Sequence, residues 1–288
     1  MQRRDFVPAL LVGALARAQD PGPARVSRKG RLKQSFFTRA FGPGMRLDDM
    51  CREAARLGAV GFEALPSDQW PTLQRFGLLC TLGLGGGMTV ENGIIQPQLQ
   101  NDLVTSMEGF IDTCAAQGCP NIALAGGQRR GMSYAKGADN AVAFLNRVKH
   151  HAEDKRVTLV LEVTNTKYED PVLGRKDQVC DHLDWAAEVC TRVNSPRVKI
   201  LFDIYHIQIM DGNIAANIRA HVPLIGHFHA AGVPGRHEID DTQELNYRFI
   251  LTTIADLGFT GYLAHEYDPS PGHDPIRSLE KVMTIADV

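Results

Sequence analysis

VTLVLEVTN (residues 157–165) is the stretch that decides the fold, because it places one carboxylate in an otherwise apolar run. Its β-branched and aliphatic residues are typical of a strand that is buried on both faces. Glu162 interrupts the run near its end. Since an unpaired buried carboxylate is costly, we expect this strand to carry Glu162 out of the core and into a polar site.

Short apolar runs of this kind alternate with longer amphipathic segments along the chain. The apolar runs are LKQSFF (32–37), VGFEAL (60–65), LLCTLGL (78–84), NIALAG (121–126), TLVLEVT (158–164), VKILFDIY (198–205), IGHFHAA (225–231) and GYLAHEY (261–267). The clearest helical patterns are RLDDMCREAARLG (46–58), DQVCDHLDWAAEVCTRVNSP (177–196) and ELNYRFILTTIADLG (244–258). Eight β-then-α units in about 260 residues favour an α/β fold of the (β/α)8 TIM barrel type over an open doubly wound sheet. We therefore predict one catalytic domain over residues 31–288.

Four consecutive predicted strands each end in a ligand-type side chain. Glu162 is followed by Asp203, His229 and Glu266, and the spacing between successive members fits one βα unit. In a TIM barrel, side chains at the C-terminal strand ends point into the mouth, where active sites lie. Three converging carboxylates repel one another and take up protons unless a cation holds them together. Two Glu, one Asp and one His form a hard ligand set that favours Mn²⁺ or Mg²⁺ over structural zinc.

Other polar side chains lie near the same predicted mouth. His227 and His229 alternate in the seventh strand, and we expect only one of them to face the barrel axis while the other packs among helices. His206 follows Asp203 by three residues and reaches the mouth once the chain turns out of the strand. Glu63, in the second strand, is a further candidate for contact with substrate.

Three motifs carry a resemblance to a known family. ILFDIYHIQIMDGN (200–213), HFHAAGVPGRHEID (227–240) and LAHEY (263–267) resemble motifs of the hydroxypyruvate isomerase family. That family belongs to the xylose isomerase-like TIM barrel superfamily, which includes the ketose 3-epimerases. The similarity extends over most of the chain and is densest from Leu159 onward. It implies a xylose isomerase-like barrel.

The resemblance also implies roles for individual residues. It places metal ligands at Glu162, Asp203, His229 and Glu266, and it gives the proton transfers to the two glutamates. His229 departs from the pattern, because hydroxypyruvate isomerases typically have Gln at this position whereas the epimerases have His. The resemblance therefore leaves the substrate open between hydroxypyruvate and a ketose.

The residue types suit the isomerisation of a small α-hydroxy carbonyl compound, which moves a proton between neighbouring carbons through an enediolate. A divalent cation that binds both substrate oxygens stabilises the developing charge, and Glu162 and Glu266 can act as base and acid. A substrate such as hydroxypyruvate, which would become tartronate semialdehyde, also needs a positive partner for its carboxylate. Arg236, accompanied by His237, is the leading candidate, and Lys167 is the second.

The composition and charge of the chain bear on the other functions that this fold could have. The formal net charge of -2 offers no basic field for nucleic acid, which disfavours a metal-dependent phosphodiesterase like endonuclease IV. A ketose 3-epimerase or another sugar isomerase remains an alternative, and His229 favours it. A non-catalytic sugar-binding barrel also remains an alternative. The sequence contains no run of 18 or more apolar residues, so we do not expect an integral membrane protein. The expected partner is a small-molecule substrate, and assembly into a homo-oligomer is left open.

The N-terminal segment requires a separate interpretation. MQRRDFVPALLVGALARAQ (1–19) has paired Arg3 and Arg4 ahead of a short apolar run and small residues near Ala18. It resembles a twin-arginine export signal, which predicts delivery to the periplasm. The alternative is the N-terminal tail of a cytoplasmic protein. Residues 1–30 are therefore interpreted as signal and linker.

Overall fold

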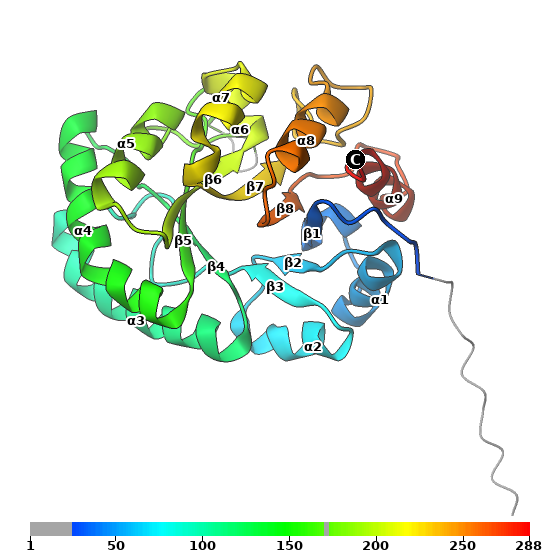
Figure 1. Ribbon diagram of the computed structural model, residues 1–288, viewed down its shortest axis with the longest axis horizontal. Helices are drawn as coiled ribbons and strands as arrows, with labels where there is room; N and C mark the ends of the chain where they lie inside the picture. The colour runs from blue at the N-terminus through cyan, green and yellow to red at the C-terminus, as the bar shows by residue number, and fades with distance from the viewer. Residues whose placement is uncertain (1–24, 170–172) are drawn as a thin grey trace, which may run out of the picture.

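The structure is a computed structural model that describes residues 25–169 and 173–288. The predicted export signal lies outside the described residues. Strands and helices alternate around a central barrel, with the helices on its outer side (Figure 1). Among the helices of the described residues, none is long and apolar enough to cross a membrane.

Eight parallel strands form the barrel, and each lies within one of the eight predicted runs. They are β1 (Lys33–Phe37), β2 (Gly61–Glu63), β3 (Leu79–Leu82), β4 (Asn121–Leu124), β5 (Thr158–Glu162), β6 (Val198–Asp203), β7 (Ile225–Ala230) and β8 (Tyr262–His265). The strand order is β3-β2-β1-β8-β7-β6-β5-β4. A single parallel bridge between Gly83 and Ile122 joins the two outer strands. The barrel is thus nearly closed, which confirms the predicted fold class.

Helices follow the strands and cover the barrel. They are α1 (Leu47–Leu57), α2 (Trp70–Arg75), α3 (Gln100–Gln117), α4 (Tyr134–Lys155), α5 (Leu183–Val193), α6 (Ile204–Met210), α7 (Ile214–His221), α8 (Tyr247–Asp256) and α9 (Pro275–Ile285). Helix α5 begins six residues later than the predicted pattern at 177. The reason is that Gln178 forms an isolated bridge with Gln128, so the chain is still extended there.

The strand register places the ends of β5 to β8 side by side, with a stagger of two residues between Glu162 and Asp203 and again between His229 and Glu266. Glu162 pairs with Leu201 across β5 and β6, and Asp203 pairs with His229 across β6 and β7. Residues two apart on a strand share a face, so Glu162 lies on the same face as Val160. Val160, together with Leu82, Ala123 and Leu201, forms a small apolar cluster separate from the main core. The polar ends therefore stand above an apolar layer inside the barrel.

Candidate active site

Four side chains converge at the C-terminal end of the barrel, and we call Glu162, Asp203, His229 and Glu266 the mouth cluster. Glu162 ends β5, Asp203 ends β6, His229 lies one residue before the end of β7, and Glu266 directly follows β8. One potential ligand atom from each lies within 4.8 Å of the others. The strand ends therefore assemble the four side chains into a group that could hold a metal ion.

The imidazole of His229 lies at the centre of the mouth cluster. Its Nδ1 is 2.7 Å from Oε2 of Glu266, 3.7 Å from Oε1 of Glu162 and 3.9 Å from Oδ2 of Asp203. Within the described part of the chain, this buried nitrogen has no hydrogen bond of suitable angle. Burial disfavours the charged ring, but Glu266 and Glu63 raise the pKa of His229 well above its usual value. A cation bound by Nδ1 and the three carboxylates would replace that proton, so the donor set fits a divalent ion.

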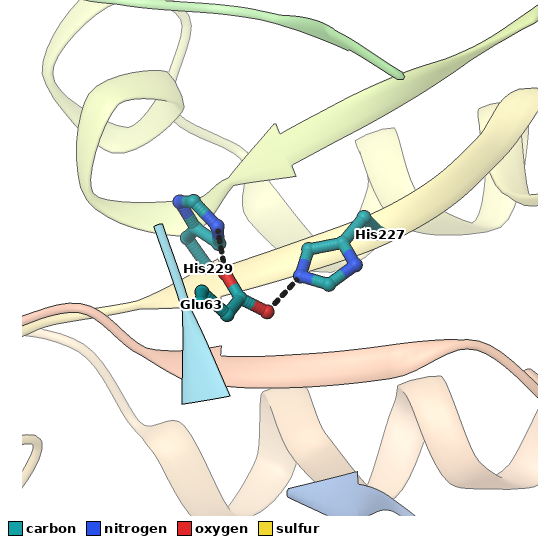
Figure 2. Close-up of side chains that lie close together, drawn as sticks. All are labelled: Glu63, His227 and His229. Atoms are coloured by element: carbon teal, nitrogen blue, oxygen red, sulfur yellow. Dashed lines mark hydrogen bonds and ion pairs between the residues drawn. The ribbon is translucent and has the colours of Figure 1, made fainter. Parts of the chain in front are cut away.

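The expectation that only one of His227 and His229 faces the barrel axis is wrong. Both rings point to the interior, because residues two apart on a strand share a face. Their Nε2 atoms lie 2.7 and 3.0 Å from the two carboxylate oxygens of Glu63 (Figure 2). Glu63 is itself fully buried. Burial alone would raise the pKa of Glu63, but the two histidines outweigh it and lower the pKa to about 2.

Asp203 is positioned by the start of the helix that follows it. Its Oδ1 accepts hydrogen bonds from the backbone N–H of Tyr205 at 2.8 Å and of His206 at 3.2 Å, so Asp203 is the N-cap of α6. Oδ2 is left to face the mouth cluster. The chain turns into the helix at this point, and the turn places His206 on the wall of the site.

His206 has a defined orientation. The amide Nδ2 of Asn165 lies 2.7 Å from Nδ1 of His206 and also donates to the carbonyl of Leu173. An amide nitrogen only donates, so Nδ1 accepts and the proton of the neutral ring is on Nε2. Burial is the main cause that lowers the pKa of His206 to about 3. His206 therefore presents a neutral N–H donor to the site.

Two arginines pair with the carboxylates of the mouth cluster. Arg236 Nη2 lies 2.9 Å from Oδ2 of Asp203 and 2.6 Å from Oε2 of Glu266. Arg39, which follows β1, donates to Oε1 of Glu266 at 3.1 Å. Burial alone would raise the pKa of Glu266, but Arg236 and His229 outweigh it and hold the pKa far below the usual range.

Glu162 has the opposite electrostatic environment. Burial and the neighbouring Glu266 raise the pKa of Glu162 to about 7. Its side chain is 27% exposed, compared with 10% for Glu266. The two glutamates therefore differ in basicity: Glu162 readily takes up a proton near neutral pH, whereas Glu266 stays ionised. A pair of carboxylates with pKa values pushed apart in this way is typical of acid–base sites.

A cavity of about 360 Å³ opens above the mouth cluster. Its polar wall includes Glu162, His206, His229, Glu266 and three arginines, Arg39, Arg175 and Arg236. The apolar residues that line the cavity include Phe37, Leu82, Leu84, Met88, Val90 and Ala123. A larger hollow of about 520 Å³ is lined by the N-terminal ends of several strands and holds no member of the mouth cluster. The smaller cavity is the one at the end of the barrel where TIM barrel active sites lie.

Three predicted substrate contacts do not line this cavity, namely Glu63, Lys167 and His237. Glu63 is buried below it. Lys167 is exposed, and His237 places its Nδ1 2.8 Å from the backbone carbonyl of Asp268. The sequence interpretation missed Arg39 and Arg175, which do line it. Arg39 lies just after β1, so a search of all eight strand ends would have found it. Arg175 lies in the long segment between β5 and α5, where no local pattern indicates a direction.

Residues 51–283 match the sequence model of a protein family that is described as the xylose isomerase-like TIM barrel. The chain belongs to the xylose isomerase-like TIM barrel family. The resemblance seen in the three sequence motifs is thereby confirmed at the family level.

Relatives of this xylose isomerase-like barrel include proteins named as isomerases. A "Putative hydroxypyruvate isomerase" of Homo sapiens is 33% identical over 168 residues, which cover 57% of this chain and 59% of that protein. A "2-oxo-tetronate isomerase" of Cupriavidus necator is 35% identical over 117 residues, which cover 40% of this chain and 42% of that protein. The chain thus matches about half the length of these relatives.

Solved structures agree on the fold of the barrel. A family 2 AP endonuclease from Brucella melitensis has a TM-score of 0.73 at 23% identity, over 85% of this chain and 95% of that chain. A 3-keto-D-glucoside 4-epimerase from E. coli has a TM-score of 0.71 at 19% identity, over 88% and 99%. At these identities the comparison supports the architecture alone.

Proposed function

We propose that this chain is a metal-dependent isomerase of a small α-hydroxy carbonyl compound, and that hydroxypyruvate, converted to tartronate semialdehyde, is its substrate. The observation that carries the proposal is the mouth cluster: three carboxylates and an imidazole within 4.8 Å of one another in the floor of a cavity. Relatives named hydroxypyruvate isomerase and 2-oxo-tetronate isomerase support the reaction class.

The mouth cluster would hold the cation, and the hard oxygen-rich ligand set favours Mn²⁺ or Mg²⁺. When bound, such a cation polarises the carbonyl and hydroxyl oxygens of the substrate. The side chains of this chain supply the rest. His206 presents its Nε2–H toward a substrate oxygen, and the apolar side chains of Leu82, Leu84 and Met88 exclude water from the reacting carbons.

The proton transfers are assigned to the two glutamates. Glu162, as an ionised carboxylate, takes the proton from the hydroxymethyl carbon, and the electron pair of that C–H bond forms the enediolate double bond. Glu266, which is ionised, takes the proton of the substrate hydroxyl group and delivers it to the neighbouring carbon, and Glu162 gives its proton to the former ketone oxygen. The former hydroxyl oxygen becomes the aldehyde, and the former ketone oxygen becomes the hydroxyl. β5 and β8 carry the two glutamates to different sides of His229.

A substrate carboxylate is supported by the charge of the cavity. Arg39, Arg175 and Arg236 all line it. Arg39 and Arg236 already pair with Glu266, so the carboxylate would share their guanidinium groups with that side chain. Arg175 lies in the described part of the segment between β5 and α5. Guanidinium groups suit this contact because they form bidentate pairs with carboxylates.

A ketose 3-epimerase is the second candidate, and His229 is the observation that favours it. The structural similarity to a 3-keto-D-glucoside 4-epimerase is compatible with this alternative. An uncharged ketose makes no use of three arginines, which is why the carboxylate substrate is preferred. An endonuclease IV-like phosphodiesterase is disfavoured, because the mouth cluster contains only one histidine.

The deciding experiment is a substrate screen with deuterium exchange. Purified protein with added Mn²⁺ is incubated in D2O with hydroxypyruvate or with a panel of ketoses, and label at the reacting carbons is followed by NMR. We expect label in hydroxypyruvate and tartronate semialdehyde. Glu162→Gln and Glu266→Gln should each lose about 10²- to 10⁴-fold in turnover while metal is still bound. The exposed Glu280→Gln is the matched control. Exchange into ketoses alone would instead establish the epimerase.

A further inference from the structure

A second buried group lies next to the mouth cluster and consists of Glu63, His227 and His229 (Figure 2). The side chains of Glu63 and His227 are fully buried, and that of His229 is 2% exposed. Glu63 belongs to β2, whereas the histidines belong to β7. The group therefore reaches across the barrel interior, and only His229 is shared with the mouth cluster.

Glu63 acts as an acceptor on both of its oxygens. Oε1 accepts from the hydroxyls of Ser35 at 3.0 Å and Thr81 at 2.8 Å, and Nε2 of His227 lies 2.7 Å away. Oε2 lies 3.0 Å from Nε2 of His229. The oxygens of Glu63 are thus occupied by contacts with hydroxyl groups and imidazole rings. We therefore interpret this carboxylate as an acceptor for its neighbours and not as the ligand of a second metal ion.

The proton on His227 has a defined position. Nδ2 of Asn121 donates to the carbonyl of Thr81 at 2.9 Å and lies 3.4 Å from Nδ1 of His227. Because an amide nitrogen cannot accept, Nδ1 of His227 must accept and the ring proton lies on Nε2. This nitrogen lies 2.7 Å from Oε1 of Glu63, at an angle outside that of a hydrogen bond. The polar contacts thus run in one direction, from Asn121 through His227 to Glu63.

We propose that Glu63 is a positioning residue for the metal site: it holds His229 in the tautomer with the proton on Nε2, which leaves the Nδ1 lone pair for a divalent cation. This inference rests on the proposed function, because it requires that the mouth cluster binds a metal. A carboxylate that accepts from the far nitrogen of a ligating histidine also orients the ring and makes it a stronger ligand.

Replacing Glu63 by Gln tests the tautomer, because an amide has one acceptor and one donor. His227 offers only its Nε2–H, so the amide oxygen must face His227. The amide nitrogen then faces Nε2 of His229 and forces that nitrogen to accept. The ring proton moves to Nδ1, where it blocks the cation. We expect Mn²⁺ to bind Glu63→Gln about 10- to 100-fold more weakly than wild type.

A second substitution should reverse this loss. His227→Phe removes the N–H that orients the amide, so in the double variant Glu63→Gln, His227→Phe the amide oxygen is free to turn toward His229. We expect Mn²⁺ affinity to recover relative to Glu63→Gln even though a further buried hydrogen bond is lost. If Glu63 had only a structural role, the double variant would have both a lower Mn²⁺ affinity and a lower thermal stability than Glu63→Gln.

Free Mn²⁺, measured by electron paramagnetic resonance, gives the affinity, and thermal unfolding in chelator gives the stability. Asp240→Asn is the matched control, because Asp240 is a buried carboxylate that pairs with Lys281 of α9 and with Thr242. It should lose stability without losing Mn²⁺ affinity. Wild-type affinity in Glu63→Gln, or no recovery in the double variant, overturns the inference while leaving the metal site intact. Absence of Mn²⁺ binding by the wild type overturns the proposed function and this inference with it.

A measurement on the wild type covers the case in which Glu63→Gln does not fold. In the Zn²⁺-loaded protein, long-range ¹⁵N–¹H correlation spectra report which ring nitrogen of each histidine carries the proton. We expect His227 and His229 both to carry it on Nε2. A proton on Nδ1 of His229, or Zn²⁺ on its Nε2, would show that Glu63 does not set the tautomer.

Discussion

Glu162→Gln should change how the stability of the metal-free protein depends on pH. The pKa of Glu162 is raised from about 4.5 to about 7 by burial and by Glu266. Below pH 4.5 the carboxyl is protonated in both the folded and the unfolded chain. Between pH 4.5 and 7 the unfolded chain loses this proton while the folded chain keeps it, so the free energy of unfolding falls as pH rises. At 1.36 kcal/mol for each pKa unit, the loss is about 3 kcal/mol and is complete above pH 7.

The assay is thermal unfolding in excess chelator at pH 5 and pH 8, for wild type and for Glu162→Gln. Gln has no charge to bury, so between pH 5 and pH 8 the variant should gain about 2.5 kcal/mol over wild type, which is roughly 5–10 °C in Tm. Glu280→Gln, an exposed change on α9, should follow wild type. Mn²⁺ should abolish the difference, because a bound cation keeps Glu162 ionised.

Equal pH dependence in wild type and Glu162→Gln would refute the reasoning. It would mean that the mouth cluster does not force a proton onto Glu162 in the metal-free protein. A variant that is less stable than wild type at both pH values would point instead to a structural role for this carboxylate.

Three further results are expected. Mn²⁺ at 100 times its dissociation constant should raise the free energy of unfolding by about 2.7 kcal/mol, and chelator should reverse this in calorimetry. Arg175→Met should raise KM for hydroxypyruvate with little change in kcat. Lys167 is exposed and lies outside the cavity, so Lys167→Met should leave both constants unchanged. Equal effects of the two substitutions would contradict the proposal that Arg175 binds the substrate carboxylate. Replacing Arg3 and Arg4 by Lys should retain the chain in the cytoplasm, and a wild-type chain found unprocessed there in cell fractions would contradict the export signal.

The strand pattern could be predicted well because it is a local property. Each barrel strand is buried, so it appears in the sequence as an apolar run, and a polar residue at its end stands out. Glu162 in VTLVLEVTN and Asp203 in VKILFDIY are visible in this way without knowledge of any neighbour. The order of the eight units then indicates a barrel, and the barrel brings the ends of neighbouring strands together.

The partners of those strand ends could not be predicted, because they come from segments that are distant in sequence. Glu63 meets His229 across 166 residues, and Arg39 meets Glu266 across 227. Only closure of the barrel makes β1 and β2 neighbours of the β7 and β8 ends. The error over His227 has a different origin: the period of two along a strand already places it on the face of His229.

Residues 157–165 and the runs that resemble them thus specify the barrel and the four side chains of its mouth cluster, since apolar burial and strand periodicity act over a few residues. The basicity of Glu162, the tautomer of His206 and the pairing of Arg236 are set by distances between side chains on different strands and loops. Electrostatic interactions and hydrogen bonds depend on those distances, and they exist only once the chain has closed on itself.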